Sequence, residues 1–272
     1  MSTEGCLVKN NRMKTALITG ASSGIGKELA RIHAAKGGNL VLVARRTDSL
    51  EELKSELESK HEVKVTIFSQ DLSEPHAAKK VFDFVQKSGI EIEYLMNNAG
   101  FGGHGEFVDR PIEKDLEMIQ LNVSALVELT HLVLQDMKAR RSGKILNTAS
   151  TAGFLPGPLQ TTYFATKAFV VSFTKGLAYE LRNSGITVTA LCPGPVKTEF
   201  EHVAGLEGGN MFDKGASALQ TAQSGYKGMM KGKVIQISDL SLAFLIRFML
   251  PLIPRTWLSA VVEKMQTVPK KS

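Results

Sequence analysis

Cysteine and proline are scarce in this chain of 272 residues, which contains two of the first and nine of the second. Cys6 and Cys192 are too few and too isolated for a disulfide framework or a zinc site, which is typical of a reducing compartment such as the cytoplasm. The low proline content, with 43% hydrophobic and 22% charged residues, excludes collagen-like and disordered chains. We expect an ordinary globular protein without a bound metal.

Long apolar runs are also missing. No run reaches the roughly 18 residues that a membrane-spanning helix needs, and the first residues carry an acid and no apolar core of a signal peptide. Acidic residues are fewer than basic ones, which gives a net charge of +6, but the basic residues form no cluster. With neither a clustered basic face nor aromatic platforms, nucleic-acid binding is disfavoured, and a phosphate-bearing small molecule fits the charge.

Short β-branched runs alternate with segments of helical periodicity along the chain. Each run reads as a strand buried on both faces, and the alternation predicts βαβ crossovers. The expected fold is therefore α/β: a single domain over residues 1–272 with a doubly wound, Rossmann-type parallel sheet of about seven strands. The predicted strands are 15–19, 40–43, 63–68, 94–96, 144–146, 186–191 and 234–237.

Two stretches depart from this alternation. Residues 195–233 are rich in glycine and methionine, and we expect them to form a mobile substrate loop over the carboxyl edge of the sheet. Residues 239–272 are strongly apolar but are interrupted by Pro251. They form either a helix packed on the domain or a partner subunit, or an interfacial element in which Arg247, Trp257 and nearby lysines meet an anionic membrane surface.

The first predicted strand runs directly into a glycine turn, Thr19 to Gly26, which a helix follows. Gly20 can take the tight turn, Gly24 lets the backbone approach a pyrophosphate, and Gly26 permits close helix packing. The glycine spacing differs by one from the common dinucleotide pattern, so a turn without a ligand is the alternative reading.

Past the second predicted strand, the acid that holds the ribose of NAD is absent, and Ala44 and Arg45 stand there. The guanidinium of Arg45 can hold a 2′-phosphate, which favours NADP; the alternative is a solvated surface charge. Asp71 could accept from an adenine amino group or cap the helix expected near Ser73.

Five motifs resemble the short-chain dehydrogenase/reductase family in order and spacing, over about residues 12 to 200. They are the glycine turn, Asn97 to Gly100, Asn122 in Leu-Asn-Val, Ser150 followed by Tyr163-x-x-x-Lys167, and Pro193-Gly194. The resemblance implies an NADP(H)-dependent oxidoreductase that interconverts a carbonyl and a secondary alcohol, with Asn122, Ser150, Tyr163 and Lys167 as catalytic residues. It implies cofactor contacts at Gly20, Ser22, Ser23, Gly24, Ile25, Gly26, Arg45, Asp71, Leu72, Asn98, Ala99, Gly100, Tyr163, Lys167, Pro193, Gly194, Val196 and Thr198.

The chemistry of these residue types supports that reading. A free phenol has a pKa near 10, and we expect the Lys167 ammonium, one helical turn away, to lower the pKa of Tyr163 so that it acts as the acid and base. Ser150 can donate to a carbonyl oxygen as charge develops there. Taken singly, the Tyr and Lys would be a surface pair, Ser150 a helix cap and Asn122 a structural buried amide.

The family pattern is not matched everywhere. Ser23 stands before Gly24 where a basic residue is expected, so phosphate discrimination would fall on Arg45. His104, near the expected mouth, is more typical of a solvated loop histidine. The substrate stays open between 3-oxoacyl thioesters, lipophilic ketones, and small ketones or sugars. The resemblance implies a homodimer or homotetramer, and the alternative function is a non-catalytic NADP(H)-binding sensor or scaffold.

Overall fold

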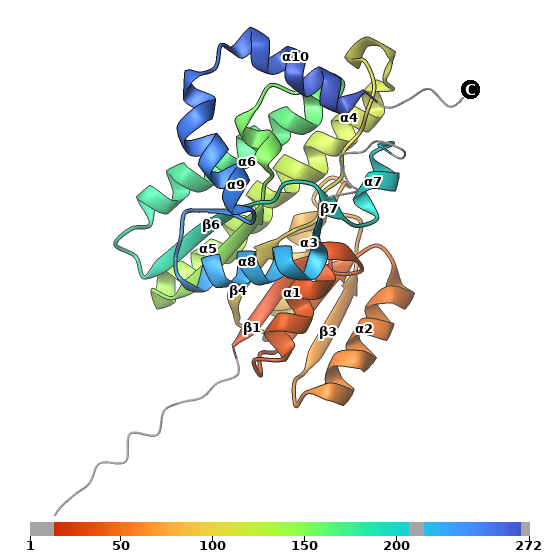
Figure 1. The fold of residues 1–272 in the computed structure, drawn as a ribbon. Coiled ribbons are helices and arrows are strands. Elements are labelled where there is room, and N and C mark those ends of the chain that lie inside the picture. Colours follow the sequence, from red (N-terminus) through yellow and green to blue (C-terminus); the bar gives the residue numbers. More distant parts are fainter. Residues whose placement is uncertain (1–13, 207–214, 268–272) are drawn as a thin grey trace, which may run out of the picture.

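The computed structural model describes residues 14–206 and 215–267, and its centre is one parallel sheet (Figure 1). In these ranges the sheet has seven strands in the order β3-β2-β1-β4-β5-β6-β9. The prediction of a doubly wound, single-domain α/β fold is confirmed, and each predicted strand is present. The strands are β1 (Thr15–Thr19), β2 (Leu40–Ala44), β3 (Val65–Ser69), β4 (Ile92–Asn97), β5 (Gly143–Thr148), β6 (Ile186–Cys192) and β9 (Ile235–Ile237).

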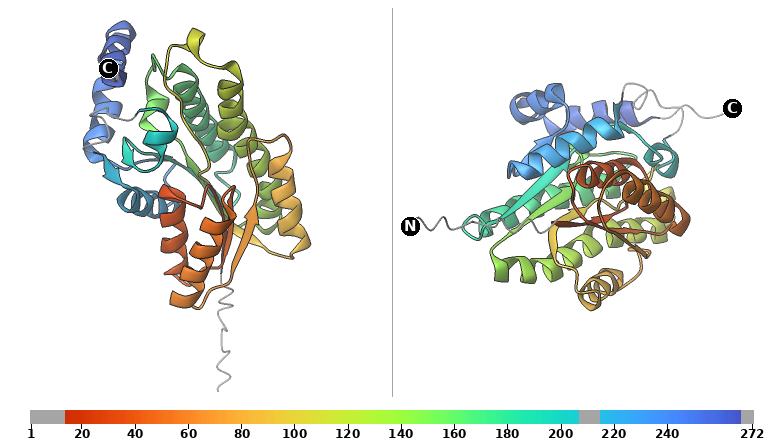
Figure 2. Two further views of the ribbon diagram at one scale, coloured as in Figure 1. Left: turned by 90° about the vertical axis from the view of Figure 1, so that its right-hand side faces the viewer. Right: turned by 90° about the horizontal axis from the view of Figure 1, so that it is seen from below.

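Helices cover both faces of the sheet, so the strands lie between two helical layers (Figure 2). Because successive strand residues point to opposite faces, Ile18 packs into the core under α1 while Leu17 packs into the core under α5. One layer contains α1 (Gly24–Ala34), α2 (Thr47–Lys60) and α8 (Ala218–Met230), and the other contains α3 (Ala77–Lys87), α5 (Leu126–Arg140) and α6 (Thr161–Glu180).

The strand order reverses beside β1, whose two neighbours are β2 and β4. After β3 the chain therefore crosses to the other half of the sheet. Crossovers on the two sides diverge from this point, which leaves a crevice at the carboxyl ends of β1 and β4. The end of β5 follows directly along the same edge, since β4 pairs with β5.

Residues 195–233 correct the expectation of one long mobile loop. They contain β7 (Val196–Lys197), α7 (Phe200–Val203), β8 (Ala216–Ser217) and all of α8, a regular crossover helix. A capping box starts α8, since Ser217 Oγ accepts from Gln220 N (3.1 Å) and Gln220 Oε1 accepts from Ser217 N (3.3 Å). Ala222, Tyr226 and Met229 then pack into the core, and the predicted loop positions 207–214 lie outside the described residues.

The chain continues after β9 into an apolar segment, residues 240–267, which we call the roof. It contains α9 (Leu240–Phe244), a π-helical turn (Leu245–Met249), a short 3₁₀ turn (Leu250–Leu252) and α10 (Arg255–Gln266). The roof packs on its own domain, because Val262 is buried against Ala152 and Phe164. Within residues 14–206 and 215–267 none of the helices combines the length and hydropathy that a transmembrane helix requires. Lys270 and Lys271 lie outside the described residues.

Candidate active site

The glycine turn that joins β1 to α1 needs glycine at three positions. Gly20 and Gly24 have positive φ values of 65° and 53°, which side-chain-bearing residues rarely adopt. A Cβ on Gly20 would lie 2.9 Å from Ala99 Cα, and one on Gly26 would lie 2.3 Å from the carbonyl oxygen of Gly20. Gly26 thus serves the close packing predicted for it, while Gly20 and Gly24 shape the open side of the turn.

Short polar side chains brace the turn from the neighbouring strand end. The Thr19 hydroxyl accepts from the backbone N–H of Asn98 (2.9 Å) and of Ala99 (3.0 Å). The Asn98 amide in turn donates to the carbonyl oxygens of Thr19 (3.2 Å) and Gly20 (3.3 Å). These bonds connect β1 to β4 beyond the last ladder pair, and they hold the turn rigidly at the crevice.

Arg45 and Asp71 lie together at the far end of the crevice. A guanidinium nitrogen of Arg45 is 3.6 Å from Asp71 Oδ2, and the Arg45 side chain is two-thirds exposed. Asp71 Oδ1 accepts from the Ser73 backbone (2.9 Å) and hydroxyl (2.6 Å). Burial acts to raise the pKa of Asp71, but these bonds and the Arg45 charge outweigh it and leave that pKa below its usual value.

Arg46 connects two sides of the crevice through contacts that the sequence did not predict. It donates to both carboxylate oxygens of Glu199 (2.8 and 3.2 Å) and to Ser22 Oγ in the glycine turn (3.3 Å). The hydrogen bonds from Arg46 hold the pKa of Glu199 below its usual range. The pair of adjacent arginines was the available sequence signal, but nothing in the sequence indicated which partner either would meet.

Ser150, Tyr163 and Lys167 converge at the other end of the crevice. Ser150 follows β5, and its hydroxyl accepts from Ala152 N (3.1 Å), so it does cap a short helical turn, Thr151–Phe154. Tyr163 and Lys167 are one turn apart in α6, with Lys167 Nζ 5.7 Å from the centre of the Tyr163 ring. Lys167 Nζ also donates to the Thr148 carbonyl at the end of β5 (2.9 Å).

Burial sets the direction of the pKa shifts of Tyr163 and Lys167. For Tyr163 this direction is opposite to the one expected from the sequence. Loss of solvent raises the pKa of Tyr163 to about 12, although a hydrogen bond with Ser150 opposes the rise. Burial lowers the pKa of Lys167 to about 8. The prediction that the Lys167 ammonium lowers the pKa of Tyr163 is therefore wrong for this structure. Desolvation acts on both side chains, and its effect on their pKa values exceeds the effect of their proximity.

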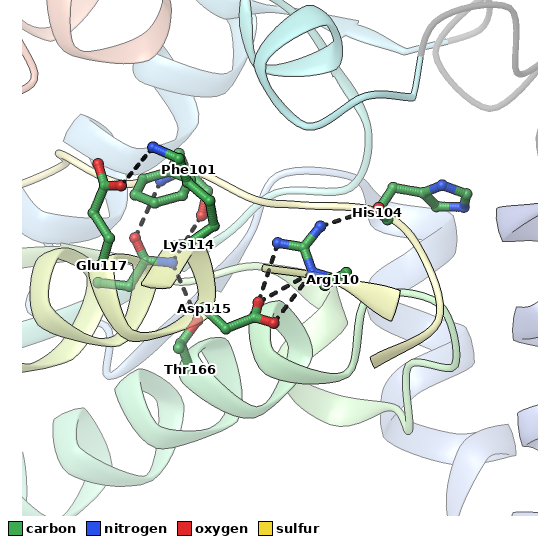
Figure 3. Close-up of polar contacts among 8 residues, drawn as sticks. Phe101, His104, Arg110, Lys114, Asp115, Glu117 and Thr166 are labelled. Atoms are coloured by element: carbon green, nitrogen blue, oxygen red, sulfur yellow. Dashed lines mark hydrogen bonds and ion pairs between the residues drawn. The ribbon is translucent and has the colours of Figure 1, made fainter. Parts of the chain in front are cut away.

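Asn122 lies behind the crevice wall, in a π-helical turn (Gln120–Ala125) between α4 (Ile112–Ile119) and α5. Its amide is satisfied on both sides: Oδ1 accepts from Phe101 N (3.1 Å), and Nδ2 donates to the Phe101 carbonyl (2.9 Å) and to Thr166 Oγ1 (3.2 Å) (Figure 3). A Cβ on Gly100 would approach Asn122 Oδ1 to 2.9 Å and Lys167 Nζ to 3.4 Å. Asn122 and Lys167 thus flank Gly100, and π turns recur at functional sites.

A largely buried ion pair fixes the loop that follows Gly100. Arg110 donates to Asp115 (Nη2 to Oδ1, 3.1 Å) and to the His104 carbonyl (3.0 Å) (Figure 3). The His104 ring then bonds the Gln266 carbonyl in α10 (2.7 Å), so this histidine fastens the roof to the loop. Gln160 Nε2 donates to the side chain of Gln266 as a second fastening.

These elements enclose one cleft of about 860 Å³, and both ends of the crevice open into it. All of the predicted site residues line it except Gly26 and Asn122, which support it from behind. Sequence reasoning missed the roof's part in this wall. Phe200 from α7 also lies near Tyr163 at the Ser150 end of the cleft, with the two ring centres 5.3 Å apart. The roof contributes Leu242, Leu245, Ile246, Leu250, Ile253, Trp257, Leu258, Val261, Val262, Met265 and Gln266.

Comparisons with known proteins identify relatives of this chain. The chain is 36% identical over 194 residues to the very-long-chain 3-oxoacyl-CoA reductase-B of Danio rerio, which covers 70% of this chain and 62% of that protein. It is 37% identical over 195 residues to the NADP-dependent 3-hydroxy acid dehydrogenase of Schizosaccharomyces pombe, with 70% and 74% covered. The matched stretch thus spans only about three fifths of the length of the first curated relatives.

A solved structure extends the likeness to the whole fold. The short-chain dehydrogenase from Sphingobium yanoikuyae in complex with NADPH superposes with a TM-score of 0.80 at 31% identity and covers 95% of this chain and 98% of that one. The family model described as short chain dehydrogenase matches residues 14–206, from the first strand to the end of the α7 region. The chain belongs to the short-chain dehydrogenase/reductase family of oxidoreductases, whose members bind a nicotinamide cofactor.

Proposed function

We propose that the protein is an NADPH-dependent oxidoreductase that interconverts a carbonyl and a secondary alcohol. The observation that carries this proposal is the shared cleft: Ser150, Tyr163 and Lys167 line one end of the space whose other end is the glycine turn with Arg45. A hydride donor held by the turn would present its reactive ring to the hydroxyls of Ser150 and Tyr163.

The residues present suit such a cofactor. A Cβ on Gly24 would meet Thr198 at 3.2 Å, so the turn and Thr198 form a narrow cradle beside the amino end of α1. Ser23 does not cap this helix with its side chain, which leaves first-turn N–H groups for a phosphate. Arg45 and Arg46 lie where a 2′-phosphate would be held, each paired in this structure with a carboxylate, Asp71 or Glu199. Two of the similar proteins named above are described with NADP or NADPH.

In the reductive direction the chain's own residues hold and move the proton. A nicotinamide cofactor bound at the glycine turn would supply the hydride for the carbonyl carbon. Ser150 donates a hydrogen bond to the carbonyl oxygen as negative charge grows there, and Tyr163 transfers its phenolic proton to the same oxygen, which gives the alcohol. With its pKa raised to about 12, Tyr163 is protonated at neutral pH and ready to donate. Lys167 stabilises the phenolate that remains, and Asn122 holds Phe101 and Thr166, the chain neighbours of Gly100 and Lys167.

The cleft favours lipophilic carbonyl compounds over sugars. Of the roof residues that line it, Gln266 is the one polar side chain, and it is already bonded to Gln160. The hydroxyls of a sugar would lose water there without gaining partners, whereas an alkyl chain or fused-ring ketone would bury apolar surface. The similarity to a very-long-chain 3-oxoacyl-CoA reductase supports the same class.

A carbonyl panel tests the proposal. The full chain is incubated with NADPH and a set of ketones that runs from small, polar compounds through steroid-like ketones to long-chain 3-oxoacyl thioesters, and NADPH absorbance is followed. We expect turnover with the lipophilic members and far lower kcat/KM with sugars. NADPH binding without oxidation across the panel would instead favour the non-catalytic sensor.

We also propose that the protein forms a homodimer through α6. Phe169 and Tyr179 are exposed on this helix, and Phe169 stacks on Phe173 with ring centres 5.9 Å apart. Exposed aromatic residues on a packed helix are typical of protein interfaces. Size-exclusion chromatography with light scattering of the full chain and of Phe169→Glu tests it: a dimer that the variant converts to monomer is the expected result.

A further inference from the structure

The roof has a second, outward-facing surface that is apolar and exposed. Leu252 is 79% exposed, Trp257 72% and Phe244 61%, values that a packed helix seldom shows for such side chains. Figure 1 shows this segment on the far side of the molecule from α2, and Figure 2 shows it along the outer edge. We call this surface the outer face; its residues are Phe244, Leu245, Phe248, Met249, Leu252, Trp257, Val261 and Met265.

The outer face is ordered by helical spacing. Phe244 and Phe248 are one turn apart, with ring centres 5.2 Å from each other. Trp257, Val261 and Met265 follow at intervals of four residues along α10, which places them in one stripe. Val262, next to that stripe, points inward and is buried in the domain. The roof is therefore a two-sided element, with one side packed and the other presented outward.

Charge discriminates between the surfaces that could cover this face. The sequence from 240 to 267 holds three cations, Arg247, Arg255 and Lys264, against one carboxylate, Glu263, so its net charge is +2. Arg247 and Lys264 are exposed beside the apolar residues. A two-fold contact between two copies would bring this positive segment against itself. An anionic lipid surface attracts the same charges and accepts the aromatic and aliphatic side chains between its headgroups.

We propose that the outer face docks the protein on an anionic bilayer surface, with the roof lying in the plane of the headgroups. Docking of this kind needs no spanning helix. Trp257, Val261 and Met265 also line the cleft and are more than half exposed, so they stand at its rim. Docking sets that rim against the lipid and lets a lipophilic carbonyl compound enter from the membrane. This consequence for substrate entry rests on the proposed function, whereas binding to lipid does not.

Trp257 provides a direct readout, because it is the single tryptophan of the chain and lies in the outer face. The full chain is mixed at low salt with vesicles of phosphatidylcholine and phosphatidylglycerol in equal parts, or of phosphatidylcholine alone. We expect a blue shift of the tryptophan emission and co-flotation with the anionic vesicles, both weakened by high salt. The neutral vesicles should bind much less protein.

Two matched substitutions assign the binding to this face. Leu252→Asp should weaken partitioning to anionic vesicles by at least about tenfold, because an aspartate replaces an inserted leucine. Val108→Asp is the control: Val108 is 83% exposed in the turn Phe107–Asp109, outside the roof, and its change should leave vesicle binding intact. A third variant, the double substitution Arg247→Glu and Lys264→Glu, should weaken binding by roughly tenfold or more and tests the electrostatic contribution alone.

Three results would overturn the proposal. One is the absence of both the emission shift and co-flotation at low salt. Another is equal vesicle binding by Leu252→Asp and Val108→Asp. The third is a dimer of the full chain that Leu252→Asp dissociates while vesicles bind neither form, which would assign the face to a second copy. Turnover of a short, water-soluble ketone by the same variants tests the proposed function separately, since Leu252 does not line the cleft.

Discussion

The two walls of the cleft differ in the polarity of their side chains and in how they are held in place. The sheet-side wall consists of strand ends, the glycine turn and short polar side chains such as Thr19 and Asn98, each tied to backbone groups by hydrogen bonds. The opposite wall, the roof, is almost wholly apolar and is fastened by contacts at Gln266 and by packing of Val262. The proposed function places chemistry and cofactor binding on the sheet-side wall, and choice of substrate on the apolar one.

The largest effect is expected for a substitution of Tyr163 on the sheet-side wall. Tyr163→Phe removes the proton donor but keeps the ring, so kcat for reduction should fall by about 100-fold or more. NADPH affinity, measured by fluorescence titration, should stay within about twofold, since only one hydroxyl is lost and the packing of the ring is kept. A variant that keeps more than about a tenth of the wild-type kcat would remove Tyr163 from the role of acid.

Arg45 tests the cofactor end of the same wall. Loss of a charge-assisted hydrogen bond costs about 1.5 to 3 kcal/mol, so Arg45→Ala should weaken NADPH binding by roughly 10- to 100-fold. NADH lacks the 2′-phosphate and serves as the internal control, with little change expected. Equal weakening of both cofactors would mean that Arg45 supports the turn with Asp71, 3.6 Å away, rather than the phosphate.

The pH profile reports on Lys167. Its pKa is lowered to about 8, so the ammonium that stabilises the phenolate loses its proton as the pH rises through that value. Log kcat/KM for reduction should be flat near neutrality and fall by about one unit per pH unit above 8. Lys167→Arg keeps the charge to much higher pH, so any residual activity of this variant should lack the fall. A fall that persists unchanged in the arginine variant would belong to another group.

The smallest effect is expected on the roof. Leu258→Ala removes an apolar contact from the cleft and should raise KM for a lipophilic ketone by about fivefold, with kcat changed little. KM for a small ketone should be nearly unaffected, because such a substrate does not reach the roof. Leu219→Ala, on α8 and outside the cleft, is the matched control. An equal loss of kcat for both ketones would show that the roof also orders the catalytic wall.

Much of the sheet-side wall could be predicted from sequence because its signals are local. A strand that runs into Gly20, Gly24 and Gly26 dictates a turn by itself, and the spacing of Tyr163 and Lys167 places both on one helical face. The bounds of the strands followed from short buried runs for the same reason.

The features that the sequence did not predict depend on contacts between residues that are far apart in the chain. The bridge from Arg46 to Glu199 joins positions 153 residues apart, and His104 meets Gln266 from 162 residues away. The pKa of Tyr163 was predicted to fall and instead rises, since the closing of the cleft around the phenol leaves no trace in local spacing. The glycines and methionines of residues 218–230 predict a loop, because they obscure the spacing of the apolar positions that pack α8 on the sheet.

The place of β9 in the chain bears on how the protein is synthesised. The seventh strand ends at Ile237, and the roof begins only afterwards, where Asp239 accepts from the backbone N–H of Leu242 (3.0 Å). Every described strand, the glycine turn and the side chains of Ser150, Tyr163 and Lys167 have therefore left the ribosome before the roof does. Since earlier parts of a chain fold first during translation, the surface most prone to aggregate is exposed only once its docking site on the sheet-side wall exists.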